Sequence, residues 1–240
     1  MFSRDVFKRT RRRLAVYSRR LTKDPVSDLA GLLRGEDPKV VIDVGANVGF
    51  VTWQFLKAFK NANIYALEPD PVTFGTLKAV HGDNPRVHVL PIAAADQEGE
   101  VAFIQRQVSS NSSLCEMITE TSGNHTIKVK ATTLDRLCAE HSIGHIHLLK
   151  IDTEGADLRV LQGATAMLGR GAVEVIMAEF HFIPTYKGDA TLDELTAFLK
   201  GFDFRVFNFY VGAETSRGQA RYGNAIFVGP RWHKELATTK

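Results

Sequence analysis

The sequence has 240 residues, of which 44% are hydrophobic and 24% are charged. These values match a soluble globular protein and exclude a collagen-like or intrinsically disordered chain. Two cysteines cannot build a disulfide framework, no apolar run approaches the length of a membrane span, and the basic N-terminus lacks the apolar stretch of a secretory signal. We therefore expect a cytoplasmic protein of one or two domains.

Charge is distributed unevenly along the chain. Residues 1–23 carry nine Lys and Arg side chains against one acid, whereas the remaining residues carry 21 cations and 26 acids. We therefore predict a basic N-terminal arm over residues 1–38, followed by a body over residues 39–240. Apolar residues recur along the basic segment at roughly helical intervals: Phe2, Val6, Leu14, Tyr17 and Leu21. This pattern fits a solvated helix docked on the body, peripheral contact of residues 1–23 with an anionic membrane on its inner surface, or contact with a nucleic acid backbone.

Short apolar runs alternate with helical patterns from residue 39 onward. Strands are predicted, in chain order, at residues 39–44, 63–68, 86–93, 100–105, 126–131, 146–151, 173–180, 205–210 and 224–228. Helices are predicted between them at residues 47–60, 71–81, 132–141, 155–168 and 192–199. Alternating strands and helices imply a doubly wound α/β fold with a mostly parallel sheet. The last two strands have no helix between them, so we expect an antiparallel pairing at one edge.

Ligands of such folds bind beyond the carboxyl ends of the strands, which makes the strand ends candidate sites. The first predicted strand runs into Asp43, Gly45, Asn47 and Gly49. Gly45 permits a tight turn, and Gly49 permits close packing of the following helix. A carboxylate that opens the turn would repel a phosphate, so Asp43 suits a ligand with an ammonium group better. We predict that these four residues bind a cofactor.

Two further acids follow the next strands. Glu68 ends the second strand 19 residues after Gly49, and an acid at about this spacing usually accepts hydrogen bonds from ribose hydroxyls. Glu68 could instead cap the helix that begins near Pro71. Asp96 follows the third strand, where it could receive an adenine amino group or simply form a turn. A ribose-binding acid together with a turn opened by Asp43 points to S-adenosylmethionine rather than to a dinucleotide.

Five segments together resemble the FkbM family of S-adenosylmethionine-dependent methyltransferases. They are residues 41–49 (VIDVGANVG), 68–69 (EP), 133–135 (TLD), 149–157 (LKIDTEGAD) and 160–164 (VLQGA). The resemblance extends over roughly residues 39–228 and leaves out the basic arm. It implies a class I methyltransferase fold, Rossmann-like, with a seven-stranded sheet, an antiparallel edge strand and a small β insertion between the third and fourth strands of the sheet. It also implies methyl transfer to an oxygen, commonly a hydroxyl of a sugar or secondary metabolite.

The acceptor side of the site is expected at the end of the predicted strand 146–151. Lys150 and Asp152 project to the same face of this strand, and Glu154 follows in the first turn of the next helix. An alcohol needs help to lose its proton, either from a base or from a divalent cation. We predict Asp152 or His181 as the base, with Lys150 keeping a carboxylate ionised. Asp152 and Glu154 are alternatively the ligands of a magnesium ion, and Glu179 offers a further acid near His181.

Several other features receive structural interpretations. The spacing of Phe50 and Trp53 favours core packing over cation–π contact with a ligand. His145 and His147 resemble a metal-binding pair, but they begin a strand and so lie at the wrong end of the sheet. Ser112 or Ser113 is expected in a loop that covers the site.

The leading hypothesis is therefore an O-methyltransferase with a small-molecule or carbohydrate acceptor. An NAD-dependent oxidoreductase is disfavoured because the sequence lacks GxGxxG after its first strand. Two further hypotheses are a nucleic-acid methyltransferase, with the arm as a backbone anchor, and a non-catalytic protein held at a membrane surface. We expect no nucleic acid partner, because residues 152–155 are Asp-Thr-Glu-Gly rather than the Asn/Asp-Pro-Pro-aromatic run of base-directed enzymes.

Overall fold

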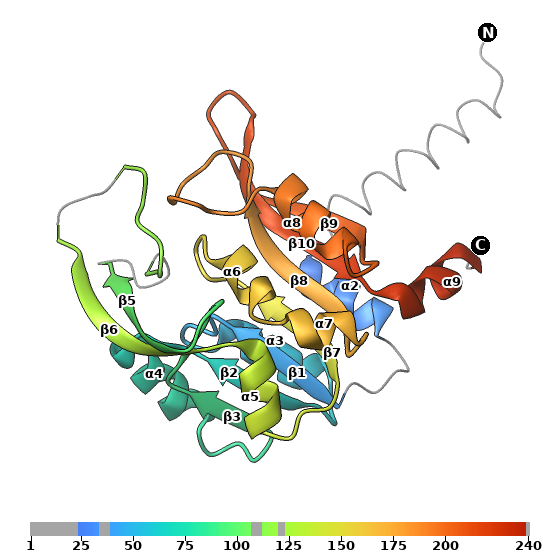
Figure 1. Cartoon of the computed structure of the whole chain (residues 1–240), viewed down its shortest axis with the longest axis horizontal. Helices are drawn as coiled ribbons and strands as arrows, with labels where there is room; N and C mark the ends of the chain where they lie inside the picture. The colour runs from blue at the N-terminus through green and yellow to red at the C-terminus, as the bar shows by residue number, and fades with distance from the viewer. Residues whose placement is uncertain (1–23, 34–38, 107–111, 120–122, 239–240) are drawn as a thin grey trace, which may run out of the picture.

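A computed structural model describes residues 24–33, 39–106, 112–119 and 123–238. The predictions made for residues 1–23 therefore lie outside the described residues. Seven strands form one sheet in the order β3-β2-β1-β7-β8-β10-β9 (Figure 1). The strands of this sheet are β1 (Val40–Val44), β2 (Asn63–Leu67), β3 (Val87–Leu90), β7 (Ile146–Ile151), β8 (Val173–His181), β9 (Arg205–Glu214) and β10 (Ala220–Val228). The predicted seven-stranded α/β fold is confirmed.

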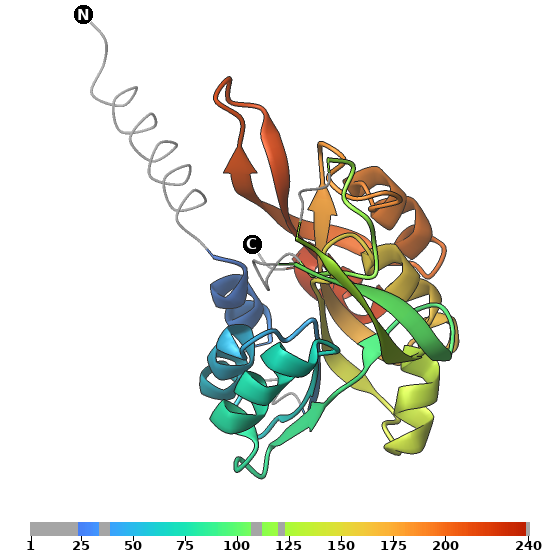
Figure 2. The same ribbon diagram turned by 90° about the vertical axis from the view of Figure 1, so that its left-hand side faces the viewer.

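The sheet turns from parallel to antiparallel at one edge. β1 pairs in parallel with β2 and β7, and β7 pairs in parallel with β8. β10 is antiparallel to both of its neighbours, β8 and β9. The last two strands extend beyond the residues predicted for them, and their hairpin reaches away from the body (Figure 2). All nine residues of β8 are buried, including three polar ones, as expected for a strand with neighbours on both sides and helices over the sheet.

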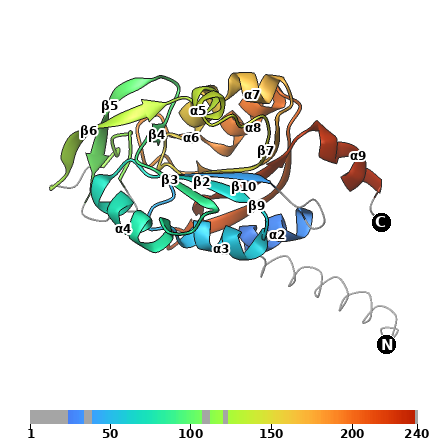
Figure 3. The ribbon, with the colours of Figure 1, turned by 90° about the horizontal axis from the view of Figure 1, so that it is seen from below.

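Helices cover both faces of the sheet (Figure 3). One face carries α2 (Pro25–Leu32), α3 (Phe50–Ala58) and α4 (Pro71–His81), whereas the other carries α5 (Leu134–Glu140), α6 (Asp157–Gln162), α7 (Thr165–Gly169) and α8 (Leu192–Lys200). A further helix, α9 (Pro230–Thr238), follows β10. Of the helices that the structure describes, none has the length and apolar character needed to cross a membrane.

The structure contains two helices that were not predicted, and it divides one of the predicted helices into two. α2 falls within the arm predicted over residues 1–38, yet its Leu29 is fully buried against Phe55 and other apolar residues of the body. α9 was not predicted, and its Trp232 packs in the same cluster. The helix predicted at 155–168 is divided into α6 and α7 at Gly163, where a side-chain Cβ would lie 2.1 Å from the carbonyl oxygen of Ala95.

A small second sheet is inserted between β3 and β7, as predicted. It contains β4 (Ala93–Ala94), β5 (Gly99–Gln105) and β6 (His125–Thr132) in the order β4-β6-β5. The strand predicted at 86–93 therefore ends early, because Ala93 and Ala94 pair with β6 instead of continuing beside β2. The inserted sheet thus begins directly at the carboxyl end of β3.

Candidate active site

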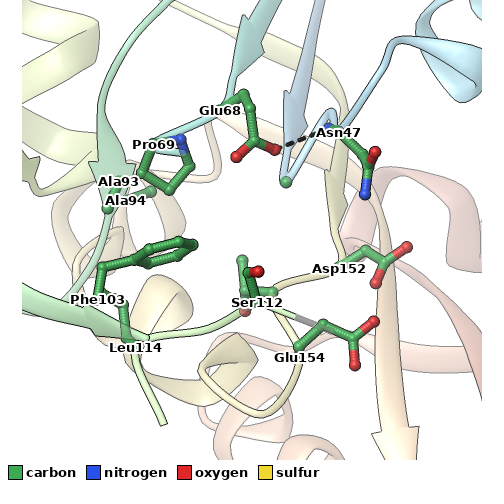
Figure 4. A pocket seen from close by; sticks show the side chains of 12 residues that line it. Asn47, Glu68, Pro69, Ala93, Ala94, Phe103, Ser112, Leu114, Asp152 and Glu154 are labelled. Atoms are coloured by element: carbon green, nitrogen blue, oxygen red, sulfur yellow. Dashed lines mark hydrogen bonds between the residues drawn. The ribbon is translucent and has the colours of Figure 1, made fainter. Parts of the chain in front are cut away.

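A pocket lies beyond the carboxyl ends of β1, β2 and β7, where the fold predicts a ligand (Figure 4). Its walls come from the ends of these strands and from the small inserted sheet. The lining residues are Gly45, Asn47, Glu68, Pro69, Ala93, Ala94, Phe103, Ser112, Leu114, Asp152, Thr153 and Glu154. The pocket thus brings together Gly45, Asn47 and Glu68 of the predicted cofactor site with Asp152 and Glu154 of the predicted acceptor site.

The turn after β1 needs its glycines for two different reasons. Gly45 has a φ of +70°, and a Cβ there would lie only 1.9 Å from the carbonyl oxygen of Asp152. Gly49 has a φ of +89° and would place a Cβ 2.4 Å from the ring of His81 on α4. Gly45 therefore allows the tight turn to touch the end of β7, whereas Gly49 allows close packing against helix α4 and not, as its place after the first strand predicts, against a strand. Gly49 does not line the pocket itself.

Glu68 is held at the pocket wall by backbone amides. Its carboxylate accepts hydrogen bonds of 2.9 Å from the amides of Asn47 and Asp70. Burial raises the pKa of Glu68 to about 7, although the two amides oppose this shift. Asp70, not Glu68, caps α4, because its side chain accepts from the amides of Val72 and Thr73. Glu68 is thus left to face the pocket.

A buried ammonium group joins β1 to β7. Nζ of Lys150 lies 3.1 Å from Oδ1 of Asp43 and 3.6 Å from Oδ2 of Asp152, and it donates to the carbonyl oxygen of Gly45 at 2.8 Å. Burial alone would lower the pKa of Lys150, but the carboxylates of Asp43 and Asp152 outweigh it and raise the pKa. Lys150 therefore stays charged, and its predicted pairing with a carboxylate is present in the structure.

Four acidic side chains gather on the pocket side of β7 and β8. Asp152 is about one-third exposed, and Glu154 accepts a hydrogen bond of 2.5 Å from the hydroxyl of Tyr186. Asp157 is buried and accepts from the amide of Glu179 at 3.1 Å. Burial raises the pKa of both Glu154 and Asp157 to about 7, and that of Glu179 to about 10. The carboxyl groups of Asp152 and Glu154 point to the same side of the pocket (Figure 4).

Comparison with known proteins identifies the family. A family model described as "Methyltransferase FkbM domain" matches residues 43–206, which is more than half of the chain. The chain belongs to the FkbM methyltransferase family. It is therefore an S-adenosylmethionine-dependent methyltransferase, and not an NAD-dependent oxidoreductase or a non-catalytic protein.

Individual relatives are distant. The 2-O-methyltransferase NoeI of Sinorhizobium fredii is 25% identical over 203 residues, which cover 78% of this chain and 80% of that protein. The hexuronic acid methyltransferase AglP of Haloferax volcanii is 30% identical over 152 residues, which cover 62% of this chain and 59% of that protein. The crystal structure of an FkbM methyltransferase from Methylobacillus flagellatus is 15% identical with a TM-score of 0.53, covering 80% of this chain and 44% of that one, and it supports the fold.

Five predicted site residues of this FkbM-family chain do not line the pocket: Gly49 and Lys150, described above, and Asp43, Asp96 and His181. Asp43 is fully buried and is occupied by Lys150 and by the hydroxyl of Thr52, which donates at 2.6 Å. A direct contact of Asp43 with a ligand ammonium does not fit this geometry. Asp96 forms an ion pair of 2.8 Å with Arg159. This contact fits a structural role of Asp96 in the turn better than binding of an adenine amino group. His181 is buried with Nδ1 3.4 Å from Asp189 and does not line the pocket, which argues against its role as the base.

Other predictions had mixed outcomes. Core packing of Phe50 and Trp53 is wrong, because their side chains are 65% and 45% exposed while Thr52 and Phe55 form the buried face of α3. His147 lies at the opposite end of the sheet from the pocket, as predicted, with its ring against the amide of Val40. Ser112 lines the pocket, as expected for one of the two serines.

The sequence analysis missed the residues that the inserted sheet brings to the site. Phe103 on β5 and Leu114 line the pocket. Tyr186, which lies between β8 and α8, donates a hydrogen bond to Glu154. Phe103 was not distinguished by the sequence, because residues 101–104 are all apolar and the structure buries Ile104 as well as Val101 and Phe103. We find no sequence signal that places Tyr186 beside Glu154.

Replacing Lys150 should show how much the pairing with Asp43 contributes to the free energy of unfolding. We expect Lys150→Met to lower the free energy of unfolding by about 3–5 kcal/mol, because it leaves a carboxylate buried without its cation. The double variant Asp43→Asn with Lys150→Met removes both charges and should recover part of that loss. Urea denaturation measures both effects. Additive losses in the double variant would mean that the two side chains do not stabilise each other.

Proposed function

We propose that this FkbM-family protein transfers the methyl group of S-adenosylmethionine to a hydroxyl group of a carbohydrate. The observation that carries the proposal is the pocket itself, with Glu68 on one wall and the carboxylates of Asp152 and Glu154 on another. Two relatives, named as a 2-O-methyltransferase and a hexuronic acid methyltransferase, favour a sugar hydroxyl as the acceptor.

The polar and apolar groups of S-adenosylmethionine match the residues that line the pocket. The ribose hydroxyls would donate to Glu68, and the adenine ring would lie against the apolar side chains of Phe103 and Leu114. The amino-acid tail would lie on the turn at Gly45 and Asn47. In this arrangement Asp43 acts indirectly, because it holds Lys150, which in turn fixes the carbonyl of Gly45.

Asp152 is the best-placed residue to act on the acceptor. Its carboxylate lines the pocket and is partly exposed, whereas His181 is buried against Asp189. The acceptor hydroxyl must lose a proton as its oxygen attacks the methyl carbon, and Asp152 is within the same pocket to take it. Activation of the hydroxyl by a magnesium ion is the second route that the sequence suggested, and carboxylate oxygens such as those of Asp152 and Glu154 are the ligands it would require.

The basic arm belongs to this proposal on its sequence alone. We propose residues 39–240 as the catalytic domain, with α2 packed against it, and a peripheral contact of residues 1–23 with an anionic membrane surface. We propose that the protein acts in the cytoplasm, where S-adenosylmethionine can reach the pocket.

Donor affinity should depend on pH through Glu68. Because its pKa is raised to about 7, Glu68 is largely protonated at pH 6, and a neutral carboxyl accepts ribose hydrogen bonds less well. We expect the Kd for S-adenosylmethionine to increase by about tenfold as the pH falls from 8 to 6. Glu68→Gln should bind S-adenosylmethionine weakly across this pH range. Any pH dependence that remains in this variant would come from titration of the ligand itself. Isothermal titration calorimetry measures both proteins, and identical pH profiles would exclude this role of Glu68.

Transfer of a labelled methyl group tests the proposed reaction. We expect label in oligosaccharides that contain hexuronic acid or neutral sugars, and none in RNA. The product should resist mild alkali, which cleaves a methyl ester of a uronic acid but leaves a methyl ether on a hydroxyl oxygen. Asp152→Asn should lower kcat by about a hundredfold or more, with donor binding retained, whereas His181→Asn should lose less. Label in RNA, or label removed by alkali, would contradict the proposal.

A further inference from the structure

Three carboxylates converge beside the pocket, and two of them, from Asp152 and Glu154, belong to its wall. Asp152 follows β7, Glu154 lies in the loop before α6, and Glu179 stands near the end of β8. One carboxylate oxygen from each residue lies within 4.8 Å of the other two. These oxygens come from two segments, the loop after β7 and the end of β8, so the fold brings Glu179 to the other two residues.

Glu179 is the member of this carboxylate cluster that needs explanation. Its side chain is only 8% exposed, and its Oε2 has no hydrogen-bond partner. Buried polar groups are normally satisfied, since leaving one unpaired costs free energy. The backbone amide of Glu179 donates to Asp157, and a side-chain oxygen of Glu179 lies within 4.8 Å of oxygens of Asp152 and Glu154. A carboxyl group in this position is satisfied either by a proton shared with its neighbours or by a bound cation, and only the cation lets all three groups be ionised together.

The protein supplies little positive charge to the cluster. Lys150 is 3.6 Å from Asp152, but it is nearer to Asp43 and is also held by the carbonyl of Gly45. Tyr186 donates to Glu154 and carries no charge. The buried carboxyl of Asp157 adds to the negative potential. Lys150 is thus shared with Asp43, and a cation bound by the three carboxylates would balance the charge that they carry when ionised.

We propose that Asp152, Glu154 and Glu179 bind a divalent cation of the kind that prefers oxygen ligands, Mg²⁺ or Mn²⁺, and that this cation holds the acceptor hydroxyl. Carboxylate oxygens are the ligands these ions select, and partial exposure of Asp152 leaves room for the acceptor or water. The catalytic part of this inference rests on the proposed function, whereas the binding site itself does not.

The proposed step balances without a further reactant. The cation lowers the pKa of the hydroxyl bound to it, and the oxygen of Asp152 that does not bind the cation takes the proton. The hydroxyl oxygen forms a bond to the methyl carbon while the C–S bond breaks, and its electron pair stays on sulfur. The products are a methyl ether and S-adenosylhomocysteine.

Binding of Mn²⁺ to the full-length chain tests the site directly. Electron paramagnetic resonance counts bound Mn²⁺ without any need for activity. We expect one Mn²⁺ per chain, displaced by Mg²⁺, and an affinity that Glu179→Gln weakens by about tenfold or more. Glu154→Gln should weaken it too, and it provides a second test if Glu179→Gln fails to fold.

A matched control lies on the same strand. Glu174 is a buried glutamate near the other end of β8, where it is 2.7 Å from His145 and from Arg231. Glu174→Gln should leave Mn²⁺ binding unchanged. Loss of binding in Glu174→Gln alone, with wild-type affinity in Glu179→Gln, would move the ion to the histidine end of the sheet and overturn the proposal.

Donor binding and methyl transfer, measured on the same samples, separate this inference from the proposed function. Sugar methylation that survives thorough chelation, together with no bound Mn²⁺, would refute the cation site and leave the proposed function intact. Mn²⁺ held by the three carboxylates without methylation of any sugar would refute the proposed acceptor and leave the site. We expect chelation to abolish methyl transfer and Mg²⁺ to restore it.

Discussion

The active site depends on one buried ammonium group. Lys150 sits between β1 and β7, paired with Asp43 on one side and close to Asp152 on the other, and it also binds the carbonyl of Gly45. Asp43 and Lys150 are partners in the register of the two strands, so the sheet itself places them together. Because Gly45 lacks a side chain, the turn can approach the end of β7 closely enough for this contact. The same charge therefore fixes both the turn on which we propose that the donor lies and the carboxylate that we propose acts on the acceptor.

The surroundings of Lys150 suit a cationic donor. Glu68, Asp152 and Glu154 all line the pocket, so a positively charged sulfonium would enter a region of negative potential. Burial raises the pKa of Glu68 and of Glu154 to about 7, which shows how costly the negative charges are without a partner. A bound sulfonium, and a cation at the carboxylate cluster, would each offset that cost. The site would thus gain stability from the two ligands that we propose for it.

The sequence predicted the fold well because its signals are periodic and local. Alternating apolar runs and helical patterns correctly indicated a mostly parallel sheet with an inserted β unit. The rule that ligands bind at the carboxyl ends of strands also selected Glu68 and Asp152, which both line the pocket. Prediction of individual roles was less successful. The rule specifies which end of a strand matters, but not which neighbour already occupies a side chain, as Lys150 occupies Asp43 and Asp189 contacts His181.

Contacts between distant segments account for the rest. Phe103 reaches the pocket only because the inserted sheet folds over the strand ends, and Tyr186 reaches Glu154 across 32 residues of sequence. Phe50 and Trp53 have helical spacing with other apolar residues, yet the helix turns Thr52 and Phe55 inward instead. Such outcomes depend on how helices and loops rotate against the sheet, which spacing along the chain does not determine.

A crystal structure with S-adenosylmethionine bound is the most direct test of this arrangement. It should show the ribose hydroxyls on the carboxylate of Glu68, the tail along the turn at Gly45, and the methyl group directed toward Asp152, with Lys150 unmoved between its two carboxylates. A donor that binds at another surface, or a pocket that stays filled by its own side chains at saturating donor, would contradict it.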